Sequence, residues 1–295
     1  MKNFINASVI VISFNHEKYI QDCLVSIVSQ KTNRIFEIIW FDDASEDQTV
    51  SKGKEILDLH NIETTYLHSS NNKFTKKISP LLELIENCRG EYIFILDGDD
   101  FWIDLKKIDL QIDALEVHKS INLCFTPAYT IENISYTPNS TINKYSDKQV
   151  IIPLDIVITG DGGLMPTASL CFRRSVFDNA PNWLFGYMPV GDYPMQVLGS
   201  KENGALFIPE ITSCYRINQS SWSKTHYEDP TNRLIFENEF LELLIKLALA
   251  VPNQKEAFLK IYLTHFKILT ELAFNQGSYS SLLQGALTSL KLPMI

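Results

Sequence analysis

The first 120 residues alternate between two patterns of hydrophobic and polar positions. Runs of β-branched and aromatic residues predict buried strands at 7–13, 35–41, 62–67 and 91–96. Between these runs, apolar residues recur at three- and four-residue spacing, which predicts amphipathic helices over 16–30, after Ser45, over 78–88 and over 105–118. Strands that alternate with helices are typical of a mostly parallel sheet with helices on both faces.

Two of these helices have a capping side chain just before them. Ser45 and Asp104 both carry an oxygen that can accept hydrogen bonds from the first turn of a helix. We therefore expect helices to begin at these two residues.

The alternation weakens after residue 120. The polar stretch 133–148 predicts an exposed loop, and a glycine-rich loop at 160–167 precedes a predicted strand at 168–173. Further elements are expected as a short helix at 192–200 and a hairpin-like pair of strands at 205–209 and 211–217.

The composition changes again near residue 229. Periodic apolar positions predict three helices, at 234–251, 256–274 and 281–290. We expect a first domain of residues 1–228, followed by a C-terminal helical region of residues 229–295. The helical region is expected to pack on the first domain, to pair with a second subunit or to lie near a membrane.

Bulk composition excludes several classes of protein. The chain has 295 residues and a net charge of -9, and without a basic run it is a poor candidate for binding nucleic acid. Its five scattered cysteines argue against a zinc site and a disulfide scaffold. Because no apolar run is long enough to span a membrane, we expect a cytoplasmic protein, with peripheral contact at the inner face of the cell membrane as a further possibility.

Two predicted strands end in clustered acids. The strand at 91–96 runs into Asp97, Asp99 and Asp100, and the strand at 35–41 runs into Asp42-Asp43. Carboxylates this close repel one another, and Mg²⁺ or Mn²⁺, which prefer oxygen ligands, would remove that cost. The simpler alternative for each cluster is an acidic turn ahead of a helix. Because ligands of such sheets bind beyond the carboxyl ends of the strands, we expect both clusters at one edge.

Two later segments carry further candidate groups. Asp192 is either the cap of a helix or a general base, and the sequence alone does not separate the two. The segment 215–223 contains Arg216, Asn218 and Trp222, which suit contacts with a diphosphate and a sugar but also fit a strand that runs into a polar loop.

Taken in order, these segments resemble the family-2 glycosyltransferases of the GT-A fold. The resemblance is carried by segments 8–20, 26–30, 37–49 and 90–102, and then by 168–175, 191–193 and Tyr215-Arg216. It covers about residues 7–223, and the segment 90–102 matches the metal-binding DXD motif of that family. A bacterial polysaccharide-type branch of the family fits the later segments.

The resemblance implies roles for individual residues. Asp43 would accept from the base of a nucleotide, Asp97 would contact ribose and metal, and Asp99 would ligate Mn²⁺ or Mg²⁺. Asp192 would deprotonate the acceptor hydroxyl. The residues implied in donor binding are Ser13, Asn15, Asp42, Asp43, Asp97, Arg216 and Trp222.

One position departs from the family pattern. Members of this branch often carry His two residues after the Arg of Tyr-Arg, and here that residue is Asn218. An amide oxygen can bind a hard cation, so Asn218 is the candidate third metal ligand, with His226 as the alternative.

The activity implied is an inverting transfer of sugar from a nucleotide diphosphate, with a UDP-sugar as the expected donor. The expected acceptor is a glycan, lipid-linked or protein-linked, in surface polysaccharide biosynthesis. Two alternatives stay open: a Mg²⁺-dependent phosphotransferase with Asp97 as nucleophile, and a non-enzymatic binding module on a degenerate transferase scaffold. Only Asn218 favours the binding module.

Overall fold

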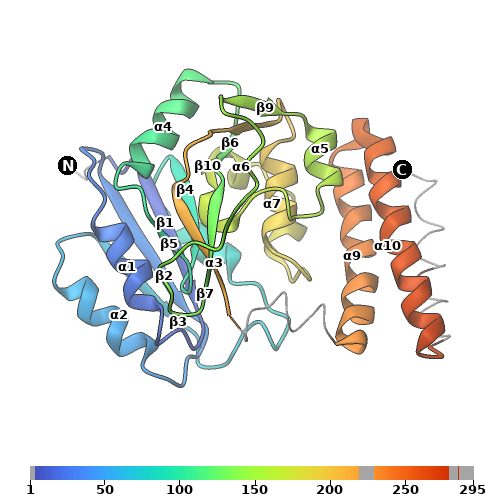
Figure 1. Cartoon of the computed structure of the whole chain (residues 1–295), viewed down its shortest axis with the longest axis horizontal. Coiled ribbons are helices and arrows are strands. Elements are labelled where there is room, and N and C mark those ends of the chain that lie inside the picture. The colour runs from blue at the N-terminus through green and yellow to red at the C-terminus, as the bar shows by residue number, and fades with distance from the viewer. Residues whose placement is uncertain (1–3, 219–228, 279–284, 286–295) are drawn as a thin grey trace.

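A central eight-stranded sheet forms the body of the molecule (Figure 1). The computed structural model describes residues 4–218, 229–278 and Gly285. In sheet order the strands are β3 (Thr64–His68), β2 (Phe36–Asp42), β1 (Ala7–Ser13), β4 (Tyr92–Asp97), β10 (Cys171–Arg173), β6 (Leu123–Phe125), β11 (Ala205–Phe207) and β9 (Val150–Ile152). The first four run parallel, whereas β10 and β9 pair antiparallel to their neighbours.

A second, four-stranded sheet lies beside the first. Its strands, in order, are β5 (Phe101–Trp102), β12 (Ser213–Ile217), β7 (Ala128–Glu132) and β8 (Ser140–Ile142). Strand β5 follows the acidic cluster directly, and β12 carries Arg216. The second sheet therefore brings Arg216 back to the end of β4 from more than a hundred residues away.

Helices cover both faces of the central sheet. The alternation along β1 shows why, since Val9 and Val11 join one buried cluster and Ile10 joins the other. The Val9 side is covered by α1 (Ile20–Val28), α2 (Thr49–Asp58) and α4 (Lys107–Val117). The Ile10 side is covered by α3 (Leu81–Asn87), α5 (Leu154–Thr159), α6 (Ser175–Asp178) and α7 (Asp192–Gly199).

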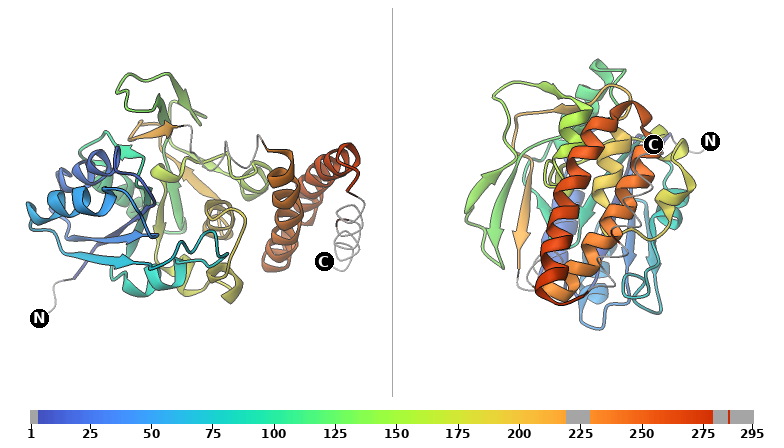
Figure 2. Two further views of the ribbon diagram at one scale, coloured as in Figure 1. Left: turned by 90° about the horizontal axis from the view of Figure 1, so that it is seen from below. Right: turned by 90° about the vertical axis from the view of Figure 1, so that its right-hand side faces the viewer.

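Two long helices form a hairpin at one end of the molecule. They are α9 (Pro230–Ala250) and α10 (Lys255–Asn275), and Figure 2 shows them away from α1 and α2. Asp229 caps α9 by accepting from two backbone N–H groups of its first turn. Phe240 of α9 and Tyr262 of α10 join the same apolar cluster as Tyr193 of α7. The hairpin thus packs on the α7 side of the sheet, and its separation as a domain stays a prediction.

Most predicted elements are present, but four helices, including α3 at Leu81, begin later than expected. α1 starts at Ile20, and neither Ser45 nor Asp104 is a helix cap. The Ser45 hydroxyl instead donates to Asp42, and Asp47 accepts from the Thr49 N–H at the start of α2. Asp104 accepts from the N–H of Lys106 in a turn that precedes α4.

The predicted hairpin at 205–217 is wrong. β11 lies in the large sheet and β12 in the small one, so the two strands do not pair with each other. The 133–148 loop contains the short strand β8, and the strand expected at 168–173 is confined to Cys171–Arg173. The helix predicted at 281–290 falls outside the described residues except for Gly285.

No helix within the described ranges is both long and apolar enough to cross a membrane.

Gly90 lets the chain that leads into β4 pass close to β1. A Cβ at this position would come within 2.4 Å of the backbone of Ala7 and Ser8, which are fixed in the sheet. Gly90→Ala should therefore lower the free energy of unfolding by about 1–3 kcal/mol, measured by chemical denaturation. Gly191→Ala is the control, because a Cβ there meets nothing within 4 Å. Equal stability of the two variants would contradict this account of β4.

Candidate active site

The carboxyl ends of four parallel strands meet at one edge of the central sheet. The register pairs Ser13 with Asp42, Ile12 with Asp97, and Asp42 with His68. The predicted strand-end residues are therefore neighbours in space. His68 was not among the predicted site residues, although it too lies at the carboxyl end of a parallel strand. Its Nδ1 lies 3.4 Å from Asp42 Oδ1.

Asp42 is enclosed by hydrogen bonds. It has no exposed surface, and its Oδ2 accepts from the Ser13 hydroxyl at 2.8 Å and from the Ser45 hydroxyl at 2.6 Å. The indole N–H of Trp40 donates to Ser13 Oγ at 2.9 Å. The hydrogen bond between Ser13 and Asp42 links the ends of β1 and β2. The predicted contact of these two residues with a nucleotide stays a prediction.

The loops after β1 and β2 are tied to each other. The N–H of Asn15 donates to Ser45 Oγ at 2.8 Å, and the Asn15 side-chain oxygen accepts from the N–H of Glu46 at 2.9 Å. Asn15 and Ala44 both have a positive φ, at 53° and 66°. Backbone in this region is uncommon outside glycine and often marks functional loops.

Asp43 faces the loop that follows β3. One carboxylate oxygen accepts from the N–H of Lys73 at 2.6 Å, and the other accepts from the N–H of Phe74 at 3.1 Å. Both oxygens therefore have a backbone partner. Recognition of a base by Asp43 stays a prediction, and it requires this loop to move or Asp43 to accept a further hydrogen bond.

The acidic cluster after β4 combines partly exposed and buried carboxyl groups. Asp97 and Asp99 keep part of their surface exposed, whereas Asp100 is buried. Burial first, and then the charges of Asp99 and Asp192, together raise the pKa of Asp97 to about 7. Burial also raises the pKa of Asp100, which keeps one buried oxygen without a hydrogen bond in the described structure.

Arg216 is a buried residue that contacts the acidic cluster. Its side chain has no exposed surface, and its guanidinium lies 4.8 Å from the ring centre of Tyr19 and 5.1 Å from that of Phe101. It donates to the carbonyl of Asp99 at 2.7 Å and pairs with Asp22 at 3.0 Å. Arg216 therefore positions the acidic loop in this conformation, and its predicted contact with a diphosphate stays a prediction.

Asp22 is a second residue that the sequence reasoning missed. It lies within α1, where nothing in the sequence separates it from an ordinary exposed acid. The hydroxyl of Tyr136 donates to it at 2.8 Å, so Asp22 also ties the 133–148 segment to the site. Only the three-dimensional arrangement reveals this role.

Asp192 stands at the start of α7. Its Oδ2 accepts from the Thr167 hydroxyl at 3.1 Å, and its Oδ1 accepts from the N–H of Tyr193 at 2.8 Å. Burial raises the pKa of Asp192. Because its charge also acts on Asp97, the two carboxyl groups lie close enough to interact.

Asn218 lies next to Asp99. Its amide nitrogen donates to Asp99 Oδ2 at 2.8 Å. The role of Asn218 as a metal ligand stays a prediction. Trp222 and His226 lie outside the described residues. Their predicted contacts with donor or metal stay predictions.

The acidic cluster suits a metal ion that is held jointly by the protein and by the phosphates of a bound substrate. In the described part of the chain, no three His, Cys, Asp or Glu side chains form a group that would hold a metal ion unaided. Mg²⁺ is commonly held by one or two carboxylates together with substrate phosphates. Two close carboxylates, with the pKa of Asp97 raised to about 7, supply hard oxygen ligands whose repulsion a dication would relieve.

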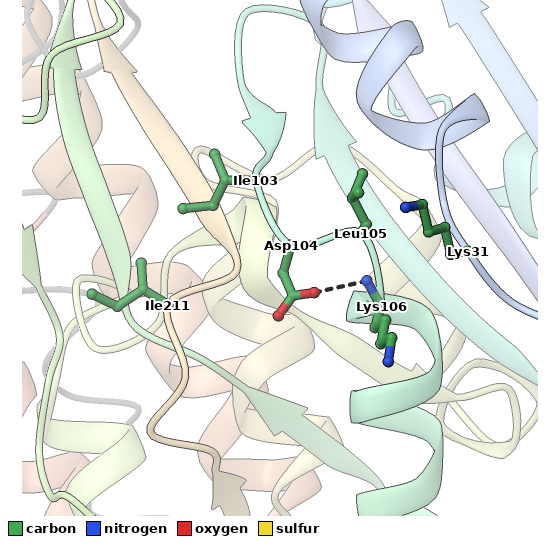
Figure 3. A pocket seen from close by; sticks show the side chains of 6 residues that line it. All are labelled: Lys31, Ile103, Asp104, Leu105, Lys106 and Ile211. Carbon is green, nitrogen blue, oxygen red and sulfur yellow. Dashed lines mark hydrogen bonds between the residues drawn. The ribbon is translucent and has the colours of Figure 1, made fainter.

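A shallow pocket of about 430 Å³ lies beyond β5, and Figure 3 shows the side chains around it. It is lined by Lys31, Ile103, Asp104, Leu105, Lys106 and Ile211. None of the predicted site residues lines it, so it is separate from the acidic cluster.

Known proteins share both the sequence pattern and the fold. An uncharacterized protein of Mycobacterium tuberculosis is 26% identical over 211 residues, which are 71% of this chain and 58% of that protein. The chain therefore spans less than two thirds of this relative.

Two solved structures share the fold at low sequence identity. One is TarS, a poly(ribitol-phosphate) beta-N-acetylglucosaminyltransferase of Staphylococcus aureus, which was crystallised with UDP-GlcNAc. It superposes with a TM-score of 0.64 at 16% identity, over 92% of this chain and 75% of the TarS chain. The mannosyltransferase PcManGT of Pyrobaculum calidifontis, with GDP-Man and Mn²⁺, gives 0.59 at 14% identity, over 99% of this chain and 81% of that one.

The sequence profile of glycosyl transferase family 2 matches residues 8–178. This match spans more than half of the chain and contains β1, β2, β4 and the acidic cluster. The protein belongs to glycosyl transferase family 2.

Proposed function

We propose that this protein is a metal-dependent, inverting glycosyltransferase that moves a sugar from a nucleotide diphosphate to a hydroxyl group of a glycan or glycoconjugate. The observation that carries the proposal is that Asp97, at the carboxyl end of the parallel strand β4, lies close enough to both Asp99 and Asp192 for their charges to act on it. The pair Asp97 and Asp99 suits a metal and a diphosphate, and the separate carboxylate of Asp192 suits a base.

The nucleoside end of the donor is assigned to the loops after β1 and β2. Ser13, Asn15, Asp42 and Asp43 all lie there, beside the half-exposed His68. A uridine nucleotide is the expected donor, which the TarS structures with UDP and UDP-GlcNAc support. The PcManGT structure with GDP-Man makes a guanosine nucleotide the alternative.

The diphosphate is assigned to the acidic cluster. Asp97, Asp99 and Asn218 would hold Mn²⁺ or Mg²⁺ there. When bound, the metal would neutralise negative charge on the leaving diphosphate. Arg216 supports this arrangement by holding the backbone of Asp99 in place.

Asp192 is assigned the role of general base. The acceptor hydroxyl gives its proton to the carboxylate while its oxygen bonds to the anomeric carbon, and the bond from that carbon to the diphosphate breaks. Attack from the side opposite the leaving group inverts the anomeric configuration. The Thr167 hydroxyl and the Tyr193 N–H orient the carboxylate, and a raised pKa makes it a stronger base than a surface aspartate.

The catalytic unit is proposed to be residues 1–228, with residues 229–295 as a helical region on the base side of the site. Surface polysaccharide biosynthesis is the proposed context, as the resemblance to a bacterial branch of the family suggests. The acceptor is then a glycan on a lipid or protein carrier.

Asp99→Asn tests the metal and donor assignment. UDP with Mn²⁺ should raise the melting temperature of the parent protein, because a ligand at about 100 times its Kd stabilises by roughly 2.7 kcal/mol. Asp99→Asn removes the charge that holds the cation and should abolish the shift, measured by thermal denaturation. Asp58→Asn, an exposed substitution at the end of α2, is the control. An undiminished shift in Asp99→Asn would rule out Asp99 as a ligand.

Asp192→Asn tests the base. Transfer, followed as nucleotide release in a panel of donors and acceptors, should fall by about 10²- to 10⁴-fold. The shift with UDP and Mn²⁺ should persist, because Asp192 is assigned no role in donor binding. Asp178→Asn, which lies on the exposed side of α6, serves as the matched control. Retained transfer in Asp192→Asn would remove Asp192 from the mechanism.

The pH dependence of transfer supplies an independent check. Only the carboxylate form of Asp192 accepts a proton, so the rate should decline as the pH falls through the raised pKa of this group. At saturating metal, the acidic limb of the parent should therefore lie above the ordinary aspartate pKa of about 4. A limb at or below that value would contradict the proposed base.

A further inference from the structure

A second buried group of charges lies outside the acidic cluster. His265 of α10 is only 2% exposed and stands between two carboxylates. Its Nδ1 lies 2.6 Å from Glu237 of α9, and its Nε2 lies 3.1 Å from Asp161 in the loop after α5. Ionised carboxylates only accept hydrogen bonds, so a histidine that donates to both must carry a proton on each nitrogen.

The surroundings favour this charged form. Burial alone would lower the pKa of His265, but the hydrogen bonds and charges of Asp161 and Glu237 outweigh it and raise the pKa to about 9. Arg233 pairs with Glu237 at 2.6 Å, on the side away from the histidine ring. The charged groups that face His265 from the described elements packed on α10 are thus Glu237 and Asp161, with Arg233 beyond them.

Asp161 belongs to the glycine-rich loop beside the proposed base. Asp161 and Gly162 have positive φ angles of 54° and 72°, so the chain turns sharply there. The carbonyl oxygens of Gly162 and Met165 both accept from the Gln196 amide at 3.3 Å. The same amide lies 3.5 Å from Asp192, and the loop continues into Thr167, which donates to that carboxylate.

A second route connects the same histidine to α7. The His265 ring packs on Phe240 with ring centres 4.5 Å apart, and Phe240 packs on Tyr193 at 5.4 Å. The Tyr193 hydroxyl donates to the carbonyl of Ile158 at the end of α5. Both routes therefore lead from α10 to the turn that holds Asp192.

We propose that His265 is a positioning residue of the active site, which holds the 160–167 loop against α7 and so fixes the orientation of Asp192. The α9–α10 hairpin is then part of the half of the site that activates the acceptor. This inference rests on the role proposed for Asp192, but the hold on the loop is measurable without turnover.

Hydrogen exchange of the backbone amides in 160–167 is the first test. A glutamine at position 265 is neutral and cannot donate to both carboxylates in the geometry of imidazolium. His265→Gln should speed exchange in this loop by about 10-fold or more, the range expected when a hydrogen bond to a charged group is lost. His60→Gln, on the exposed turn after α2, should leave the loop unchanged. Unchanged loop exchange in folded His265→Gln overturns the proposal.

Asp161→Asn keeps the inference testable if His265→Gln does not fold. Asp161 is partly exposed, and asparagine tolerates its positive φ, so this change removes one charge without straining the turn. We expect faster loop exchange and, by NMR of the imidazole nitrogens, a lower pKa for His265. An unaltered loop and an unaltered imidazole pKa would overturn the proposal.

The pH response separates positioning from general stability. A raised pKa means that the paired histidine contributes fully below its unfolded value, near 6.5, and loses its contribution as pH rises through about 9. The parent should lose loop protection, corrected for intrinsic exchange, across that window, and Asp161→Asn should show a smaller step. A parent loop with no such step contradicts the proposal.

Transfer kinetics complete the design. Both variants should lower kcat while the donor KM and the thermal shift with UDP and Mn²⁺ stay at the parent values. An unchanged kcat with a loosened loop overturns the positioning role. If the parent transfers no sugar at all, the proposed function fails, and the loop exchange still decides whether His265 holds the loop.

Discussion

Repulsion between carboxylates is the constraint on which the rest of this site depends. Asp97 lies close enough to interact with Asp99 and with Asp192, and its pKa is raised to about 7 as a result of burial and these two charges. Such groups separate unless the surrounding structure holds them in place. The strand ends fix Asp97, the small sheet fixes the loop of Asp99, and the start of α7 fixes Asp192. A dication would relieve the repulsion that the protein alone sustains.

The frame around the acids is built from segments far apart in the chain. Arg216 reaches from β12 to the carbonyl of Asp99, and its guanidinium lies between the rings of Tyr19 and Phe101. A buried guanidinium needs several partners, which Asp22 and the backbone supply. Its charge also offsets part of the negative charge of the cluster. Arg216 therefore both packs against the small sheet and balances charge in the site.

The sequence predicted the parts of the site that follow from local pattern. Continuous apolar runs gave β1, β2 and β4, and the rule for strand ends placed Asp42 and Asp97 at one edge, as the register shows. Tertiary contacts decided the rest. The sequence predicts Ser45 as a helix cap, yet its hydroxyl donates a hydrogen bond to Asp42. The sequence also predicts β11 and β12 as a hairpin, although the two strands belong to different sheets. A buried arginine and a phosphate-binding arginine look alike in sequence.

In the proposed mechanism the site has a metal side and a base side, and each depends on a different kind of cation. Arg216 would support the metal side, and a guanidinium keeps its charge over the whole accessible pH range. His265 would support the base side, and an imidazolium with a pKa near 9 loses its charge in mildly alkaline solution. Rising pH should therefore leave the metal side ordered while the turn that carries Asp192 loosens. A decline in transfer at alkaline pH would then originate in the C-terminal hairpin and not in the groups that exchange protons with the substrate.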